Sequence, residues 1–217
     1  MIKVQLFPDG FDAAIIANGE RPSHELPLGL LKEAPYVVCC DGAVQWYEQA
    51  DAVVGDGDSI PSWAKEKYEC IFHREDEQED NDLTKATRFC LAKGFRRLLY
   101  LGATGMREDH TLGNISLLMR YAREMGVTPI MATNYGWFEP VIARDEHVFV
   151  RQFPSFAKQQ VSLFNFGCRS FRTEGLRYDG YPFGQWWQGT LNEATADHFT
   201  IEADGDYLVF RTYEEKR

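Results

Sequence analysis

Short apolar runs alternate with longer amphipathic segments along the first 135 residues of the chain. The apolar runs have the length of buried strands and lie at residues 13–17, 36–40, 52–54, 70–73, 98–101 and 128–132. The segments between them show helical features and lie at residues 25–33, 43–49, 62–68, 83–93 and 112–125. Strands that alternate with helices predict an α/β domain, in which a mainly parallel sheet carries helices on both faces.

The pattern changes after about residue 137, where long helical periods end. Short apolar runs separated by turn residues follow at residues 148–150, 161–166, 170–173, 199–202 and 207–211. This pattern predicts a small all-β domain, either a sandwich or a barrel. We therefore expect two domains, at residues 1–137 and 138–217.

The composition restricts the classes of protein to which the chain can belong. The 217 residues are 44% hydrophobic and 26% charged, as in a soluble globular protein, and the net charge of −10 disfavours nucleic acid and anionic membranes as partners. No apolar run is long enough to span a bilayer, and the N-terminus lacks the pattern of a secretory signal. Five cysteines without a C-x-x-C pair indicate free thiols rather than a disulfide framework or zinc site. We expect a cytoplasmic protein.

Asp56 and Asp58 follow the apolar run 52–54 directly, with glycines on both sides. Two carboxylates at this spacing can converge on one hard cation, while the glycines let the backbone approach closely. An ordinary tight turn is the alternative, because Asp and Gly are also turn residues.

An acidic run at residues 75–82 holds six acids in eight positions, immediately before the helix expected near Leu83. A solvated loop with Asp82 as the helix N-cap is one interpretation. However, the run follows a predicted strand, so it should reach the same sheet edge as Asp56 and Asp58. That much negative charge at one edge favours a site for a cation.

Two further segments end at this edge. Asp41-Gly42 follows the run 36–40, and residues 101–111 form a glycine-containing loop before a helix. Such a loop can offer backbone N–H groups to a phosphate, and Arg107 adds guanidinium donors, whereas we expect His110 only to line the site. The P-loop, G-x-G-x-x-G, EF-hand, H-E-x-x-H and G-x-S-x-G patterns are not present.

Four segments, at residues 40–43, 55–60, 78–85 and 102–114, occur in the order found in thiamine pyrophosphokinases, and the chain resembles that family over nearly its whole length. Asn18-Gly19 is similar to the family's first loop. The resemblance implies a Rossmann-like catalytic domain with a C-terminal β domain. It also implies Mg²⁺-dependent transfer of pyrophosphate from ATP to thiamine, which releases AMP. A homodimer with the active site at its interface is implied as well.

The resemblance also implies roles for individual residues. The metal acids would be Asp56, Asp58 and Asp82, with Asp41, Arg107 and Asp109 as further catalytic residues. ATP would contact Asn18, Gly42, Gly102, Thr104, Gly105, Arg107 and Asn114. Thiamine would contact Gln78, Asp82, Tyr178 and Asn192, and Trp186 or Trp187 could add a stacking face.

The chain departs from the family pattern at several of these positions. Glu77 and Glu79 stand where Asp is usual, Gly57 replaces a bulky residue and Leu191 replaces a serine. Two other functions fit the same residues. One is a related pyrophosphokinase that acts on a pterin alcohol, and the other is a non-catalytic regulator that binds nucleotide or thiamine.

Overall fold

The computed structural model describes residues 6–144 and 147–215, and the chain divides into two compact units on either side of Asn134. Residues 1–5, which we expect to carry no secretory signal, lie outside the described residues. No helix within the described residues combines the length and the apolar composition needed to cross a bilayer.

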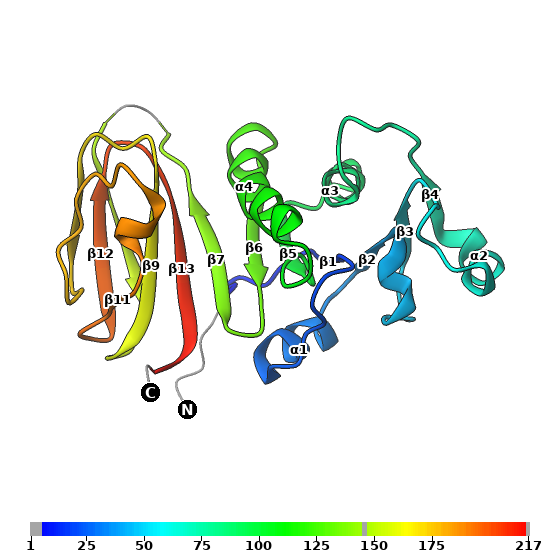
Figure 1. Cartoon of the computed structure of the whole chain (residues 1–217), viewed down its shortest axis with the longest axis horizontal. Coiled ribbons are helices and arrows are strands. Elements are labelled where there is room, and N and C mark those ends of the chain that lie inside the picture. Colours follow the sequence, from blue (N-terminus) through cyan, green and yellow to red (C-terminus); the bar gives the residue numbers. More distant parts are fainter. Residues whose placement is uncertain (1–5, 145–146, 216–217) are drawn as a thin grey trace. The chain divides into compact units, whose positions relative to one another are not determined.

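The N-terminal unit is built on six parallel strands, in the order β6-β5-β1-β2-β3-β4 (Figure 1). Their bounds are β1 Ala13–Ile16, β2 Val37–Cys40, β3 Ala52–Gly55, β4 Phe72–Arg74, β5 Arg97–Leu101 and β6 Thr128–Ala132. Every residue of β1, β2 and β3 is buried, as expected for strands covered on both faces. The predicted mainly parallel α/β fold is confirmed.

Four α-helices and two 3₁₀ turns connect these strands: α1 Glu25–Lys32, η1 Asp41–Gln45, α2 Ser62–Tyr68, η2 Glu69–Ile71, α3 Asp82–Ala92 and α4 Glu108–Glu124. Helix α3 packs on β1, β2 and β3, α4 packs on β6, and the two helices touch each other (Figure 1). The strand order reverses direction at β1. Right-handed crossovers therefore place α1 and α2 on the opposite face of the sheet.

The C-terminal unit is a β-sandwich. One sheet has the order β11-β9-β13-β7 and the other the order β10-β12-β8, and neighbouring strands within each are antiparallel. The bounds are β7 Gly136–Val141, β8 Phe149–Pro154, β9 Gln159–Phe166, β10 Phe171–Glu174, β11 Asn192–Glu193, β12 His198–Ala203 and β13 Asp206–Glu215, with the 3₁₀ turn η3 at Trp186–Gly189. Alternate residues of β12 are buried, as expected for strands that present one face to the core.

Two local predictions were wrong, and one strand was missed. The helix expected at residues 43–49 is the shorter 3₁₀ turn η1, because the connection must also cross from β2 to β3. Helix α4 begins at Glu108 instead of residue 112, since Glu108 and Asp109 suit the positive end of a helix. Strand β7 was not predicted, because Pro140 disfavours a strand and Glu139 looks like a solvent-facing residue.

We predict that Gly189→Ala destabilises the β-sandwich by about 1–3 kcal/mol, because a Cβ there would lie 2.0 Å from the carbonyl oxygen of Leu163. The control is Gly29→Ala in α1, where a Cβ meets nothing within 4 Å. That change should stabilise the protein by about 1 kcal/mol through helix propensity. Urea unfolding of both variants measures the two effects, and a fully stable Gly189→Ala variant would contradict this close packing.

Candidate functional site

A pocket of about 370 Å³ opens in the N-terminal unit, at the carboxyl ends of β1, β2 and β5. The strand order reverses here, which is where open α/β sheets bind their ligands. The lining residues are Ala17, Asn18, Gly19, Cys40, Gly42, Ser59, Asn81, Asp82, Leu83, Gly102, Ala103, Thr104, Met106, Arg107, His110, Thr111 and Asn114. Eight of the residues predicted for the site are therefore brought together: Asn18, Gly42, Asp82, Gly102, Thr104, Arg107, His110 and Asn114.

Glycines allow two loops of this pocket to meet. The N–H of Gly19 donates to the Gly102 carbonyl at 2.6 Å, and the N–H of Glu20 donates to the Thr104 carbonyl at 2.7 Å. A Cβ on Gly19 would lie 2.4 Å from the Gly102 oxygen, so no larger residue fits. Gly102 and Gly105 also have positive φ angles, of 62° and 85°. These glycines shape the loop after β5.

The N-terminus of α3 forms another wall of the pocket. Asp82 as the N-cap was one of the two interpretations of the acidic run, but the cap is Asn81, whose side-chain oxygen accepts the N–H of Thr84 at 3.0 Å. Asp82 is therefore the first helical residue and its carboxylate has no capping role. The side chain of Asp82 is instead available to the pocket that it lines.

Asn114 braces the pocket from α4. Its amide nitrogen donates to the carbonyl oxygen of Ala103 at 2.8 Å, and its amide oxygen accepts from Asn81 at 3.0 Å. One buried side chain thus joins the loop after β5 to the start of α3. Both ends of its amide group are used within the protein, so Asn114 holds the pocket walls together.

Asp41 is the most buried acid of the site, with 1% of its surface exposed. One carboxylate oxygen accepts the N–H of Ser59 at 3.0 Å, while Oδ1 is buried and accepts no hydrogen bond from any described residue. Burial raises the pKa of Asp41, and the nearby charges of Asp82 and Asp56 raise it further against the opposing N–H of Ser59. This oxygen lacks a positive partner.

Asp56 lies near Asp41 and affects its pKa. Its carboxylate accepts the N–H of Asp58 at 3.0 Å and the side-chain amide of Gln78 at 3.3 Å, and these two donors lower the pKa of Asp56. Asp58 itself is exposed. Gln78, predicted to contact thiamine, contacts Asp56 in this structure. Asp41, Asp56, Asp58 and Gln78 are thus close to the pocket, although they are outside its lining.

Lys85 is a charged residue of the site to which we assigned no role from the sequence. Its side chain is 3% exposed, and its ammonium lies 3.5 Å from the Asp82 carboxylate, one turn away on α3. Burial raises the pKa of Asp82, whereas the Lys85 charge lowers it. The available signal was the Asp-x-x-Lys spacing at the start of a helix, which places the two side chains on one face.

Magnesium fits this donor set in part. Across residues 6–144 and 147–215, no three His, Cys, Asp or Glu side chains converge closely enough to hold a metal ion alone. Mg²⁺ commonly binds through one or two carboxylates and keeps water or substrate phosphate as its other ligands. The unpartnered oxygen of Asp41, with Asp56 and Asp82 nearby, suits such an ion.

Arg107 and Asp109 form an exposed ion pair at 2.6 Å on the rim of the pocket. Arg107 lines the pocket, whereas Asp109 and Gly105 are outside the lining. The N–H of Gly105 donates to the hydroxyl of Thr111 at 3.2 Å, which ties the loop to the first turn of α4. Asp109 therefore acts on the Arg107 guanidinium and is not itself a wall of the pocket.

The remaining predicted residues belong to the C-terminal unit. Asn192 donates to the carbonyl of Tyr178 at 2.8 Å and accepts the N–H of Tyr178 at 3.1 Å, so it fixes the backbone beneath that ring. Tyr178 is 59% exposed, and the Leu191 backbone has a φ of 63°. Trp186 packs on Phe164 and Phe166, whereas Trp187 is 71% exposed.

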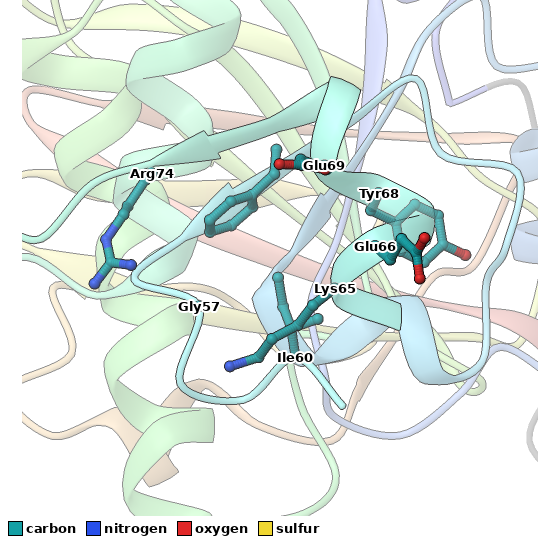
Figure 2. Close-up of a pocket in the computed structure, with 8 residues that line it drawn as sticks. Gly57, Ile60, Lys65, Glu66, Tyr68, Glu69 and Arg74 are labelled. Carbon is teal, nitrogen blue, oxygen red and sulfur yellow. The ribbon is translucent and has the colours of Figure 1, made fainter. Parts of the chain in front are cut away.

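A second cavity, of about 360 Å³, lies beside the Asp56–Asp58 loop. Its lining residues are Gly57, Ile60, Lys65, Glu66, Tyr68, Glu69, Phe72 and Arg74 (Figure 2). The backbone at Gly57 has a φ of 87°, and a Cβ there would lie 3.3 Å from the Phe72 ring. A larger residue at position 57 would therefore crowd this cavity and strain the loop.

The fold and the pocket define a protein with an α/β unit suited to phosphorylated ligands and a β-sandwich unit. Residues 28–128 match the model of the thiamin pyrophosphokinase catalytic domain, and residues 136–210 match the model of the thiamin pyrophosphokinase substrate-binding domain. The two matches together cover most of the chain, which belongs to the thiamin pyrophosphokinase family.

Individual relatives agree with this assignment. Thiamin pyrophosphokinase 1 of Caenorhabditis elegans is 30% identical over 115 residues, an alignment that covers 47% of this chain and 46% of the relative. The matched region is thus about half the length of that relative. Thiamine pyrophosphokinase from Bacillus subtilis has a similar structure, with a TM-score of 0.75 at 19% identity over 93% of this chain and 98% of the other.

The fold is also similar to that of thiamin pyrophosphokinase from Candida albicans. The TM-score is 0.75 at 17% identity, and the alignment covers 94% of this chain and 90% of the other. The yeast enzyme gives a TM-score of 0.76 at 15% identity, over 96% and 88% of the two chains. At these identities the comparisons establish the fold.

We predict that Asn114→Ala lowers the free energy of unfolding by about 1–3 kcal/mol, because it leaves the buried Ala103 carbonyl without its donor. Leu112→Ala, two residues earlier on the same helix, is the control, since Leu112 is 58% exposed and should matter little. Denaturant titrations compare the two variants. Equal, small losses of unfolding free energy in the two variants would contradict a role for Asn114 in joining the pocket walls.

Proposed function

We propose that the chain is a thiamine pyrophosphokinase that transfers pyrophosphate from ATP to the hydroxyl group of thiamine and yields thiamine diphosphate and AMP. The observation that carries this proposal is the match of both parts of the chain to the catalytic and substrate-binding domains of one family. The pocket supports it, because a glycine-containing loop, a helix N-terminus and Arg107 suit a polyphosphate.

Asp56, Asp58 and Asp82 would hold Mg²⁺ beside Asp41. When bound, the ion supplies charge neutralisation for the polyphosphate. Arg107 and the N–H groups of the loop after β5 add further neutralisation, and the loop carrying Asn18 and Gly19 faces the same pocket. Asp109 orients Arg107 through the ion pair between them.

In the reaction, the thiamine hydroxyl oxygen forms a bond to the β-phosphorus of ATP, and the bond between that phosphorus and the bridging oxygen to the α-phosphate breaks. AMP leaves with that oxygen. The hydroxyl proton passes to a carboxylate of the cluster formed by Asp41, Asp56, Asp58 and Asp82. Such a transfer depends mainly on positioning and charge, with little covalent chemistry for the protein.

Thiamine binding is assigned to the C-terminal domain, residues 138–217, and ATP and metal binding to residues 1–137. The exposed side chain of Tyr178 suits the cationic thiazolium, and Asn192 holds the backbone of Tyr178. Gln78, in the N-terminal domain, is also proposed to contact thiamine. We further propose a cytoplasmic homodimer with the active site at its interface, which light scattering coupled to size-exclusion chromatography would test.

Purified protein with ATP, Mg²⁺ and thiamine should form AMP and thiamine diphosphate in equal amounts, and chelation of the metal should stop the reaction. Chromatographic detection of both products measures this. AMP formed with a pterin alcohol but not with thiamine would favour the related pyrophosphokinase. Thiamine binding without turnover on either acceptor would favour a regulator.

We predict that Asp58→Asn lowers turnover at least about 100-fold, because loss of a metal ligand removes several kcal/mol of charge stabilisation in the transition state. The fold should remain, since Asp58 is exposed. Asp9→Asn is the control, an exposed acid at the start of the N-terminal unit, near β1. Circular dichroism and initial rates separate the two effects, and near-normal activity would remove Asp58 from the metal site.

A further inference from the structure

The acidic segment at residues 75–80 connects β4 to α3 and borders the aspartate cluster. It begins with a hydrogen bond of 2.9 Å from the N–H of Glu75 to the carbonyl of Gly55, the residue before Asp56. The sequence predicted that charge here would favour a cation site. In the structure, much of that charge is neutralised by arginines of α3 and α4.

Arg88, on α3, gathers three carboxylates of the segment. Its Nη1 donates to Asp80 at 2.5 Å, and its Nη2 donates to Glu75 at 3.0 Å and to Glu77 at 2.9 Å. A planar guanidinium can serve several acceptors in this way, whereas a lysine ammonium lacks the forked geometry. Single exposed ion pairs contribute little to stability, but here three acids share one cation.

Two other contacts make the segment compact. Arg120 of α4 donates to the second oxygen of Asp80 at 2.7 Å, so Asp80 is held between two helices. Glu77 accepts the backbone N–H of Asp80 at 2.9 Å and also that of Glu79. Glu77 and Glu79, the two neighbours of Gln78, are therefore tied to Arg88, directly or through Glu77, whereas Asp76 pairs with Arg74.

Gln78 is the residue that this arrangement presents to the site. Its amide nitrogen lies 3.3 Å from Asp56 Oδ2 and 3.3 Å from the carbonyl oxygen of Asp76. The other oxygen of Asp56 accepts the N–H of Asp58 at 3.0 Å. The orientation of the Asp56 carboxylate thus depends on one donor from its own loop and one from the acidic segment.

We propose that Arg88 is a positioning residue of the active site. By gathering Glu75, Glu77 and Asp80, it places Gln78 so that the amide holds the Asp56 carboxylate in the orientation that metal and polyphosphate binding require. This inference rests on the proposed function of the aspartate cluster. Arg88 touches neither substrate nor metal and acts through Gln78.

Loss of Arg88 should loosen the segment without unfolding the domain. Its side chain is 38% exposed, and the core of α3 is formed by other residues, including Leu83, Ala86 and Cys90. Without the guanidinium, the carboxylates of Glu75 and Glu77 lose their counter-charge and repel each other. Gln78 is then free to leave Asp56.

The test compares Arg88→Met, Gln78→Ala and the double variant. We expect Arg88→Met to raise the Mg²⁺ concentration for half-maximal rate about 10-fold to 100-fold, with a smaller effect on kcat at saturating Mg²⁺. Gln78→Ala should shift the Mg²⁺ dependence by a similar factor, measured at saturating thiamine because Gln78 is also proposed to contact thiamine. The Mg²⁺ dependence of the double variant should be no worse than that of either single one. Arg88→Lys should restore only part of the loss. Arg96→Met, an exposed arginine in the connection between α3 and β5, is the control and should behave as wild type.

Amide hydrogen exchange gives a second readout that needs no turnover. Arg88→Met should speed exchange in peptides spanning residues 55–60 as well as 75–80, with the β1 and β5 peptides unchanged. Faster exchange confined to 75–80 with an unchanged Mg²⁺ dependence would overturn the proposal, as would multiplicative effects in the double variant. If the wild type does not turn over, the proposed function fails, and exchange at 55–60 still decides whether Arg88 controls the Asp56 loop.

Discussion

Repulsion among the carboxylates at the carboxyl edge of the parallel sheet is the constraint on which the rest of the site depends. Asp41 is almost fully buried there, and burial together with Asp82 and Asp56 raises its pKa. Buried carboxylates persist only where donors or positive charges offset their repulsion and lost hydration. The surrounding loops and helices supply the donors and positive charges that offset this repulsion.

Helix α3 provides much of that compensation. Asp82, Lys85 and Arg88 follow one another at three-residue intervals, which places them along one side of the helix. Lys85 is buried beside Asp82, whereas Arg88 is half-exposed and collects the acids of the segment before the helix. The acids around this helix therefore fall into two groups. Asp82, beside Lys85, lines the pocket, whereas the acids beside Arg88 form ion pairs within the protein.

Close backbone approach is the second requirement of the site. A Cβ on Gly55 would lie 2.7 Å from the Cβ of Asp41, and a Cβ on Gly19 would meet the loop after β5 at 2.4 Å. The same glycines that suggested turns and metal loops in the sequence therefore have a packing role. They let the strand ends come close enough for the acids that follow β2 and β3 to influence each other and Asp82 of α3.

Local residue patterns were enough to predict the parallel sheet, the β-rich second unit and the edge at which the acids collect, because such patterns encode buried strands and turns. Which acids face the pocket could be read only from the folded chain. Asn81 rather than Asp82 caps α3, Glu139 of the unpredicted strand β7 pairs with Arg211, and Arg120 reaches Asp80 from 40 positions away. These choices depend on which donors the folded chain brings near each carboxylate, and that proximity is not encoded in any local pattern.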